Sequence, residues 1–165
     1  QGIIGIGDTA IFPRVLRIAR KGYFPIIGDR KVMMDLTAVE NVVHAIECAR
    51  VAPDAALGKK FNITNGEPVN NAEMIAEVLR KLGIKYRERP LSHRKAMIVA
   101  AILENVYRAL PFAGEPPLTR YTVCALGYSR TLNIESAERE IGYRPIVPFG
   151  AALERTLEWL KASGS

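Results

Sequence analysis

The stretch that decides the fold reads GDRKVMMDLTAVENVVHA and occupies residues 28–45. Its order of residue types predicts a turn, a short strand and a helix. Thr37 and Glu40 stand three residues apart where the helix should begin. This is the spacing of a capping box, in which each side chain bonds a backbone N–H that the first helical turn leaves unpaired. We therefore predict a helix from about Ala38, with the residues just before it held rigidly.

Apolar residues continue along this predicted helix at steps of three and four, which places them on one face. A face of this kind is expected to pack against a larger body. Its members are Val39, Val42, Val43, Ile46 and Ala49.

Length and composition suit one globular domain or a large piece of one. The 165 residues are 48% hydrophobic and 24% charged, which suits a globular chain with a real core. The formal charge of +6 is interspersed with Asp and Glu, without basic and aromatic residues alternating, so a solvated basic surface is favoured over a nucleic-acid site. Cys48 and Cys124 have no close partner, which argues against a zinc site or disulfide framework and favours a cytoplasmic location.

Membrane insertion and secretion find little support in the sequence. The longest apolar run, residues 96–103, is far shorter than the ~20 residues that cross a bilayer. No secretory signal pattern opens the chain. The longer segment 93–110 is nevertheless apolar enough to predict a helix that is buried or partly faces a membrane.

The first half of the chain alternates predicted strands and helices. Residues 2–6 and 23–27 are apolar and strand-like, and residues 60–65 alternate apolar and polar side chains before the Asn65-Gly66 turn. Between the first two segments lies a helix with one apolar face, formed by Phe12, Val15, Leu16 and Ala19.

The second half is predicted to be mostly helical. A helix capped by Asn70 or Asn71 and ended by Gly83 is followed by a possible strand at 84–89, then by the helix at 93–110. A loop at 111–117 and a short helix at 118–126 come next. Two further helices are expected: one capped by Asn133 and ended by Gly142, and a last one with Phe149, Leu153, Leu157 and Leu160 as its inner face.

Three segments carry a resemblance to a known family. They are VENVVHA at 39–45, FNITNGEP at 61–68, and NIESAEREIGYRP at 133–145, the last followed by a helix that bears LEWL at 157–160. Together they resemble the extended short-chain dehydrogenases/reductases, also called the NAD-dependent epimerase/dehydratase group. The resemblance implies an α/β fold, namely the C-terminal part of a Rossmann-type enzyme. Residues 1–66 would form its last strands and helices with a substrate-loop insertion, and 67–165 a mostly helical substrate-binding region.

The resemblance also draws attention to what the chain lacks. The family's Gly-rich dinucleotide fingerprint and its Tyr-x-x-x-Lys catalytic pair precede the region that this chain matches, and neither occurs here. We therefore expect a C-terminal fragment with no catalytic residue of its own, inactive alone and binding no cofactor alone. In a parent protein with a preceding Rossmann portion, the resemblance implies NAD(P), with Gln1, Gly2 and Ile3 as cofactor contacts.

The residues just before the helix predicted from Ala38 suggest which branch of the family the chain resembles. Members that bind sugar nucleotides carry Arg-Asp-Phe here, whereas this chain has Met34-Asp35-Leu36. A methionine offers a pliable apolar wall instead of a phosphate partner. The sequence therefore resembles the 3-beta-hydroxysteroid dehydrogenase-like branch, and a steroid-like or long-chain substrate is expected. The expected substrate contacts are Ile4, Val32, Met34 and Arg130.

Other interpretations of these residues stay open. Met33 and Met34 could simply fill a core, and Arg130 could pack along the surface instead of meeting an anionic group. His44 and His93 lack partners at metal-ligand spacing, so structural roles are favoured and no metal site is predicted. The whole chain could also be part of a nucleotide-sugar epimerase or dehydratase, or a stand-alone module for an apolar ligand or protein. A homodimer is a further possibility.

Overall fold

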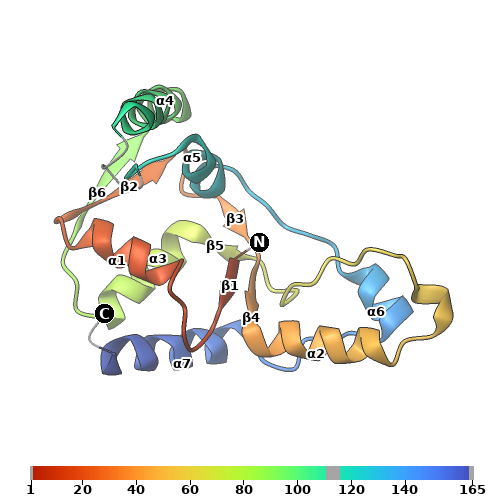
Figure 1. Ribbon diagram of the computed structural model, residues 1–165. Helices are drawn as coiled ribbons and strands as arrows, with labels where there is room; N and C mark the ends of the chain where they lie inside the picture. Colours follow the sequence, from red (N-terminus) through yellow and green to blue (C-terminus); the bar gives the residue numbers. More distant parts are fainter. Residues whose placement is uncertain (1, 111–115, 164–165) are drawn as a thin grey trace.

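The computed structural model describes residues 2–110 and 116–163, which form a mixed α/β structure (Figure 1). Within these residues the strands associate in three pairs. Strands β1 and β4 run parallel, β2 and β6 run parallel, and β3 and β5 run antiparallel. The strands are β1 (Gly2–Ile4), β2 (Tyr23–Ile27), β3 (Met33–Met34), β4 (Leu36–Ala38), β5 (Val69–Asn70) and β6 (Arg87–Leu91).

Helices surround these strand pairs. Helices α1, α3 and α7 lie around β1 and β4, helices α4 and α5 lie together on one side, and α2 extends away with α6 as an arm (Figure 1). The helices are α1 (Phe12–Ala19), α2 (Val39–Arg50), α3 (Asn71–Lys81), α4 (His93–Ala109), α5 (Arg120–Gly127), α6 (Glu135–Ile141) and α7 (Phe149–Ala162), with a 3-10 turn at Asp54–Ala56.

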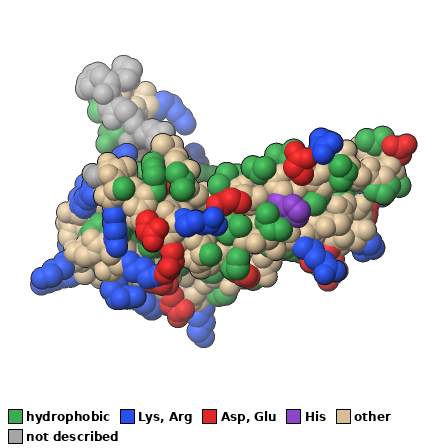
Figure 2. Space-filling model, turned by 90° about the horizontal axis from the view of Figure 1, so that it is seen from below, with side chains coloured by type: hydrophobic (Ala, Val, Ile, Leu, Met, Phe, Trp, Pro, Cys, Tyr) green, Lys and Arg blue, Asp and Glu red, His purple; other side chains and the backbone are tan. Residues whose placement is uncertain are grey.

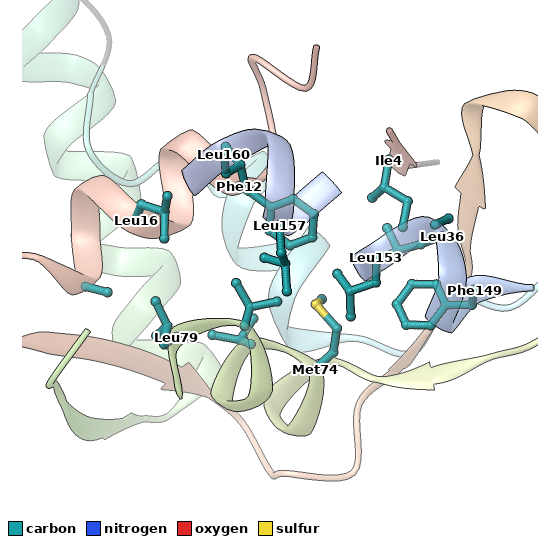
Figure 3. Packing of buried hydrophobic residues seen from close by; sticks show 14 of the residues in the cluster. Ile4, Phe12, Leu16, Leu36, Met74, Leu79, Phe149, Leu153, Leu157 and Leu160 are labelled. Carbon is teal, nitrogen blue, oxygen red and sulfur yellow. The ribbon is translucent and has the colours of Figure 1, made fainter. Parts of the chain in front are cut away.

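The main core lies between α1, α3 and α7 and the β1–β4 pair, and Figure 3 shows its side chains converging. The apolar faces predicted for α1 and α7 point into it, which confirms that part of the sequence analysis, and α3 contributes Met74, Ile75, Val78 and Leu79. The core combines residues from both sides of residue 66. Its members include Ile4, Phe12, Leu16, Leu36, Met74, Leu79, Leu153, Leu157 and Leu160.

Side-chain caps fix several helix starts. The Asp8 carboxylate accepts hydrogen bonds from the N–H groups of Ala10, Ile11 and Phe12 at 2.8–2.9 Å, just before α1. The Asn70 side chain accepts from the two N–H groups of residues 72 and 73, so it is the cap of α3. These bonds satisfy donors that a helix leaves unpaired at its first turn.

The predicted capping box of α2 is wrong. Strand β4 continues through Ala38, so Thr37 is a strand residue, and its hydroxyl donates to the Ile63 carbonyl at 3.4 Å. Glu40 instead forms an ion pair with Arg155 at 3.2 Å. Helix α2 still begins at Val39, close to the predicted start. Its first turn is held by residues distant in the chain, namely Asn65, which bonds the Ala38 N–H, and Arg155, which pairs with Glu40.

The predicted packing face of α2 is not covered by the part of the chain that the structure describes. Val43 and Ile46 are 56% and 62% exposed, and hydrophobic side chains line this arm of the molecule in Figure 2. The opposite face packs instead, with Ala45 against Ala137 and Tyr143 of the α6 region. The periodicity of the sequence identified an apolar face of α2, but it did not show which part of the chain packs against the helix.

Two predicted strands differ from the structure. Residues 60–65 form no strand, because side chains bond their backbone in place of a neighbouring strand. The strand predicted at 84–89 lies slightly later, as β6, and pairs with β2. The predicted helices at 93–110 and 118–126 are present as α4 and α5. Of the predicted loop 111–117, residues 111–115 lie outside the described residues.

A buried polar network joins α2 to the segment before α7. The Asn41 side-chain amide donates to Asn65 Oδ1 and to the Val147 carbonyl, both at 2.8 Å. Asn41 Oδ1 accepts from the N–H groups of Ile146 and Val147, both at 2.9 Å. Asn65 Oδ1 also accepts from the Ala38 N–H at the start of α2. Because buried polar groups must be paired, this network sets where the three segments meet.

Tyr143 forms a second buried hydrogen bond to the segment that contains Asn65, and its ionisation should affect the free energy of unfolding. Its ring is fully buried and its hydroxyl donates to the Thr64 carbonyl at 2.8 Å. Burial raises the pKa of Tyr143 from its ordinary value of 10 to about 12. The folded state therefore disfavours the phenolate, so the contribution of Tyr143 is fully present below pH 10 and is lost as the pH rises toward 12.

We expect Tyr143→Phe to be less stable than the parent chain at neutral pH, because the Thr64 carbonyl loses its donor. Above pH 10 the two unfolding free energies should converge, since only the tyrosine must be kept neutral. Urea unfolding of both proteins across this pH range measures the difference. A gap that stays constant with pH would contradict the assignment.

Candidate functional site

The residues predicted to contact substrate are partly brought together by the short strand β3. Met34 forms a bridge with Arg130, a residue 96 positions later. The Arg130 N–H donates to the Met33 carbonyl at 2.8 Å, and the Arg130 carbonyl accepts from the Asp35 N–H at 3.1 Å. The structure thus places the backbones of Met34 and Arg130 side by side.

Two polar side chains hold the segment of Arg130 against β3, and the sequence analysis assigned neither a role there. The Ser129 hydroxyl accepts from the Met33 N–H at 3.0 Å. The buried Asp35 carboxylate accepts from the Leu132 N–H at 2.7 Å. The isolated acid within the apolar run VMMDLTA was the signal that could have indicated Asp35, because a buried carboxylate needs a donor.

The predicted cofactor contacts, Gln1, Gly2 and Ile3, stand at the start of β1. Gly2 pairs with Leu36, which follows Met34 by two residues, so the start of β1 lies near β3. Ile3 is 48% exposed, and within the described residues β1 pairs on one edge only. Gln1 lies outside the described residues.

Two glycines of this region are closely packed within the chain. A Cβ placed on Gly2 would lie 2.5 Å from Leu36 Cδ2 and 2.8 Å from Ile11 Cδ1, so the glycine serves packing within the chain. A Cβ on Gly5 would meet Val39 Cγ1 at 2.5 Å in the same way. Contact of Gln1, Gly2 and Ile3 with a dinucleotide stays a prediction.

The remaining predicted substrate contacts are more enclosed. Val32 is buried beside α3, where its carbonyl accepts from the Asn71 N–H at 2.9 Å, and it lines a narrow hollow with Ile27 and Leu126. Ile4 is fully buried in the main core, and Met34 is partly buried against that core. Contact of these side chains with a substrate stays a prediction.

Both histidines have structural contacts. The His93 Nε2 lies in hydrogen-bond contact with the Gly127 carbonyl, and its ring lies against Tyr128 with centroids 4.5 Å apart. His44 Nε2 lies 3.5 Å from Cys48 Sγ on the next turn of α2. Among the described residues, no three His, Cys, Asp or Glu side chains gather as metal ligands would. None of the described helices is long and apolar enough to cross a membrane.

Curated relatives match nearly the whole chain but extend well beyond it. The chain is 34% identical to the 2-alkyl-3-oxoalkanoate reductase of Stenotrophomonas maltophilia, over 99% of the chain and 49% of the relative. It is 36% identical to isoform 2 of the Arabidopsis thaliana 3beta-hydroxysteroid-dehydrogenase/decarboxylase, over 96% of the chain and 30% of the relative. The chain thus spans half or less of these relatives.

Solved structures confirm the predicted α/β, Rossmann-type fold class. An epimerase from Methanothermobacter thermautotrophicus superimposes with a TM-score of 0.65 at 20% identity, over 99% of this chain and 42% of that protein. The UDP-glucuronic acid 4-epimerase from Bacillus cereus, solved with NAD, gives 0.62 at 15% identity, over 98% and 42%. At these identities the likeness concerns the fold alone.

The family model of the 3-beta hydroxysteroid dehydrogenase/isomerase family matches residues 1–93, which is more than half of the chain. This range contains β3, the exposed edge of β1 and the organising stretch at 28–45. It agrees with the branch that Met34 suggested from the sequence. The chain therefore belongs to the 3-beta hydroxysteroid dehydrogenase/isomerase family.

Proposed function

We propose that the chain is the substrate-binding part of an NAD(P)-dependent oxidoreductase that acts on a hydroxyl or ketone of a hydrophobic, steroid-like or long-chain compound. The single observation that carries the proposal is the bridge between Met34 and Arg130. The bridge joins the backbone of Met34 to that of Arg130, an exposed residue, near the start of β1. In the proposal, Met34 supplies an apolar wall and Arg130 a polar group at its rim. An apolar wall with one polar group at its rim suits an amphipathic substrate.

The relatives support the oxidoreductase class. Those named above are a reductase of an oxoalkanoate and a dehydrogenase of a hydroxysteroid. In the proposal, a Rossmann portion that precedes this chain in a longer protein supplies the phosphate-binding loop and the Tyr-x-x-x-Lys pair. The exposed Ile3 and the free edge of β1 would then face NAD(P).

A nucleotide-sugar substrate is the second candidate, because solved structures of similar fold include a UDP-glucuronic acid epimerase. A diphosphate is best bound by arginines that form two parallel hydrogen bonds. Met34 cannot provide them, and it stands where members of the family that bind sugar nucleotides carry an arginine. The hydrophobic substrate is therefore the better supported of the two.

The test compares the 165-residue chain with a longer protein that contains it. We expect no NAD(P)-dependent turnover by the chain alone, because hydride transfer needs a positioned cofactor and a proton donor of suitable pKa. The longer protein should turn over steroid-like or long-chain hydroxy and keto compounds. Spectrophotometric assays with a panel of these compounds and of nucleotide sugars measure both expectations.

Each part of this proposal has its own contrary result. Turnover by the chain alone would show that it holds a complete active site. Efficient turnover of a nucleotide sugar by the longer protein would reject the hydrophobic substrate. A gene that encodes no Rossmann portion upstream would favour a stand-alone binding module.

The exposed face of α2 and the free edge of β1 lead to a prediction about association. Open strand edges and apolar patches favour contact between molecules. We expect the isolated chain to self-associate at micromolar concentrations, and Val43→Ser with Ile46→Ser to weaken this by about tenfold. Leu57→Ser is the control, since Leu57 is also highly exposed but lies beyond the helix.

Light scattering across a concentration series measures this association. A constant monomer mass for the unmodified chain would contradict the prediction. An equal effect of Leu57→Ser would show that general surface hydrophobicity, and not the face of α2, drives the contact.

A further inference from the structure

His93, the first residue of α4, joins this helix to the end of α5. Its ring nitrogen Nε2 lies in hydrogen-bond contact with the Gly127 carbonyl. Because a carbonyl oxygen only accepts, Nε2 carries the proton of this bond. The ring also lies against the side chain of Tyr128, with centroids 4.5 Å apart. One side chain of α4 therefore holds both the last residue of α5 and the residue that follows it.

Two glycines leave room for this ring. A Cβ placed on Gly28, where φ is +76°, would run into the imidazole, and a Cβ on Gly127 would lie 2.8 Å from Nε2. Gly28 follows β2 directly, and its N–H donates to the Leu91 carbonyl at 2.9 Å. The imidazole thus lies close to backbone on two sides, which fixes its position more closely than a bond at one atom would.

The two backbone segments beside the ring lead to the candidate site. From Gly28 the chain runs through a turn to Met34 on β3. From Gly127 it reaches Arg130 after three residues. His93 therefore lies between the two segments that carry the paired residues of the site.

Arg130 lies in a stretch whose position depends on its attachments. It and the residues beside it are exposed and belong to no helix. The Ser129 hydroxyl and the bridge to β3 hold the middle of the stretch, and the Leu132 N–H is bonded beyond it. On the other side, the attachment is the contact of His93 with Gly127. Since the last carbonyls of a helix lack partners within the helix, we expect the end of α5 to fray without this contact.

We propose that His93 is a positioning residue of the candidate site: it holds the end of α5, and through the stretch that follows it sets where Arg130 stands for the polar end of a substrate. The inference rests on the proposed function, in which Arg130 contacts that end. His93 needs no contact with the substrate, since it acts through Arg130. Holding Arg130 in place before the substrate arrives lowers the entropic cost of binding.

Amide hydrogen exchange of the 165-residue chain, followed by NMR, tests the hold of His93 on Arg130 without any turnover. In His93→Ala, the Arg130 N–H, which belongs to the bridge with β3, should exchange about tenfold faster. Gly127→Ala, whose methyl group would meet the ring, should have the same effect. His93→Gln keeps a side-chain N–H donor and should restore most of the protection. The Ala38 N–H, which is bonded elsewhere in the fold, is the internal reference and should not change.

Kinetics of a longer protein that contains this chain test the consequence for the substrate. His93→Ala should raise KM by about tenfold and change kcat less, and Arg130→Ala should raise KM at least as much. The double variant should resemble Arg130→Ala alone, because His93 acts through that residue. A purely structural role of His93 would add its full effect in both backgrounds. The matched control is His44→Ala, the same substitution at the second histidine of the chain, which should leave KM unchanged.

Circular dichroism establishes that each variant is folded before these comparisons. Unchanged exchange of the Arg130 N–H in His93→Ala and Gly127→Ala would overturn the proposal, whether or not turnover is found. Additive effects of His93→Ala and Arg130→Ala on KM would also overturn it, as would an equal effect of His44→Ala. Arg130→Ala with unchanged KM would instead reject the proposed substrate site. The exchange result is independent of that outcome, so the two failures are distinguishable.

Discussion

Replacing Asn41 by leucine should lower the free energy of unfolding by more than about 3 kcal/mol. Asn41 is fully buried and makes four hydrogen bonds, two as donor and two as acceptor. Leucine has the same branched shape but no polar atoms, so the backbone groups of Ile146 and Val147 would lose their partners inside the protein. Unpaired buried groups are the costly part of such a change.

Urea unfolding monitored by circular dichroism measures this loss. Asn105→Ala is the control, because Asn105 is an exposed residue of α4, and we expect a change within about 0.5 kcal/mol. A loss below about 1 kcal/mol for Asn41→Leu would show that water can replace these bonds and that the network is not structural.

The second large effect concerns substrate choice. In a longer protein that contains this chain, Met34→Arg should lower kcat/KM for a hydrophobic hydroxy or keto compound by tenfold or more, a change of at least about 1.4 kcal/mol. An arginine without a phosphate partner places a charge against an apolar substrate, where it is poorly solvated. Steady-state kinetics with the best substrate from the panel measures the effect.

Stability must be followed in the same variant, because Met34 is partly buried against the main core. Met34→Leu is the control, since it keeps the apolar volume and should retain most activity. A melting temperature that falls steeply in Met34→Arg would attribute the lost turnover to core filling by Met34. Unchanged kcat/KM in a folded Met34→Arg variant would remove Met34 from the substrate site.

Local patterns predicted the helices well because their evidence lies within one helix. The apolar faces of α1, α3 and α7 repeat every three or four residues, and each points into the main core. Caps such as Asn70 and the helix end at Gly142, where φ is +67°, are equally local. Features of this kind depend on residues only a few positions apart.

The failures involve partners that are distant in the chain. Thr37 and Glu40 have the spacing of a capping box, yet contacts with Ile63 and Arg155 decide their roles. Residues 60–65 have the alternation of a strand, but the hydroxyls of Thr37 and Tyr143 donate to the backbone carbonyls of Ile63 and Thr64. Periodicity carries no information about such partners.

In the candidate site, too, residue types could be recognised from the sequence, whereas contacts between distant segments could not. Met34 and Arg130 could each be singled out by residue type, but their adjacency depends on a bridge across 96 positions. The bond between Asp35 and Leu132 that maintains it also joins distant segments. One sequence without related sequences contains no local sign of these pairings.

The position of α7 has a consequence for folding during synthesis on the ribosome. Its residues Leu153, Leu157 and Leu160 complete a core whose other members begin at Ile4. Helix α7 must therefore have left the ribosome before β1 and α1 can complete this core. Chains in that state are prone to aggregate, and chaperones protect them. The apolar sides of β1 and α1 therefore stay uncovered by α7 on the nascent chain until that helix has been made.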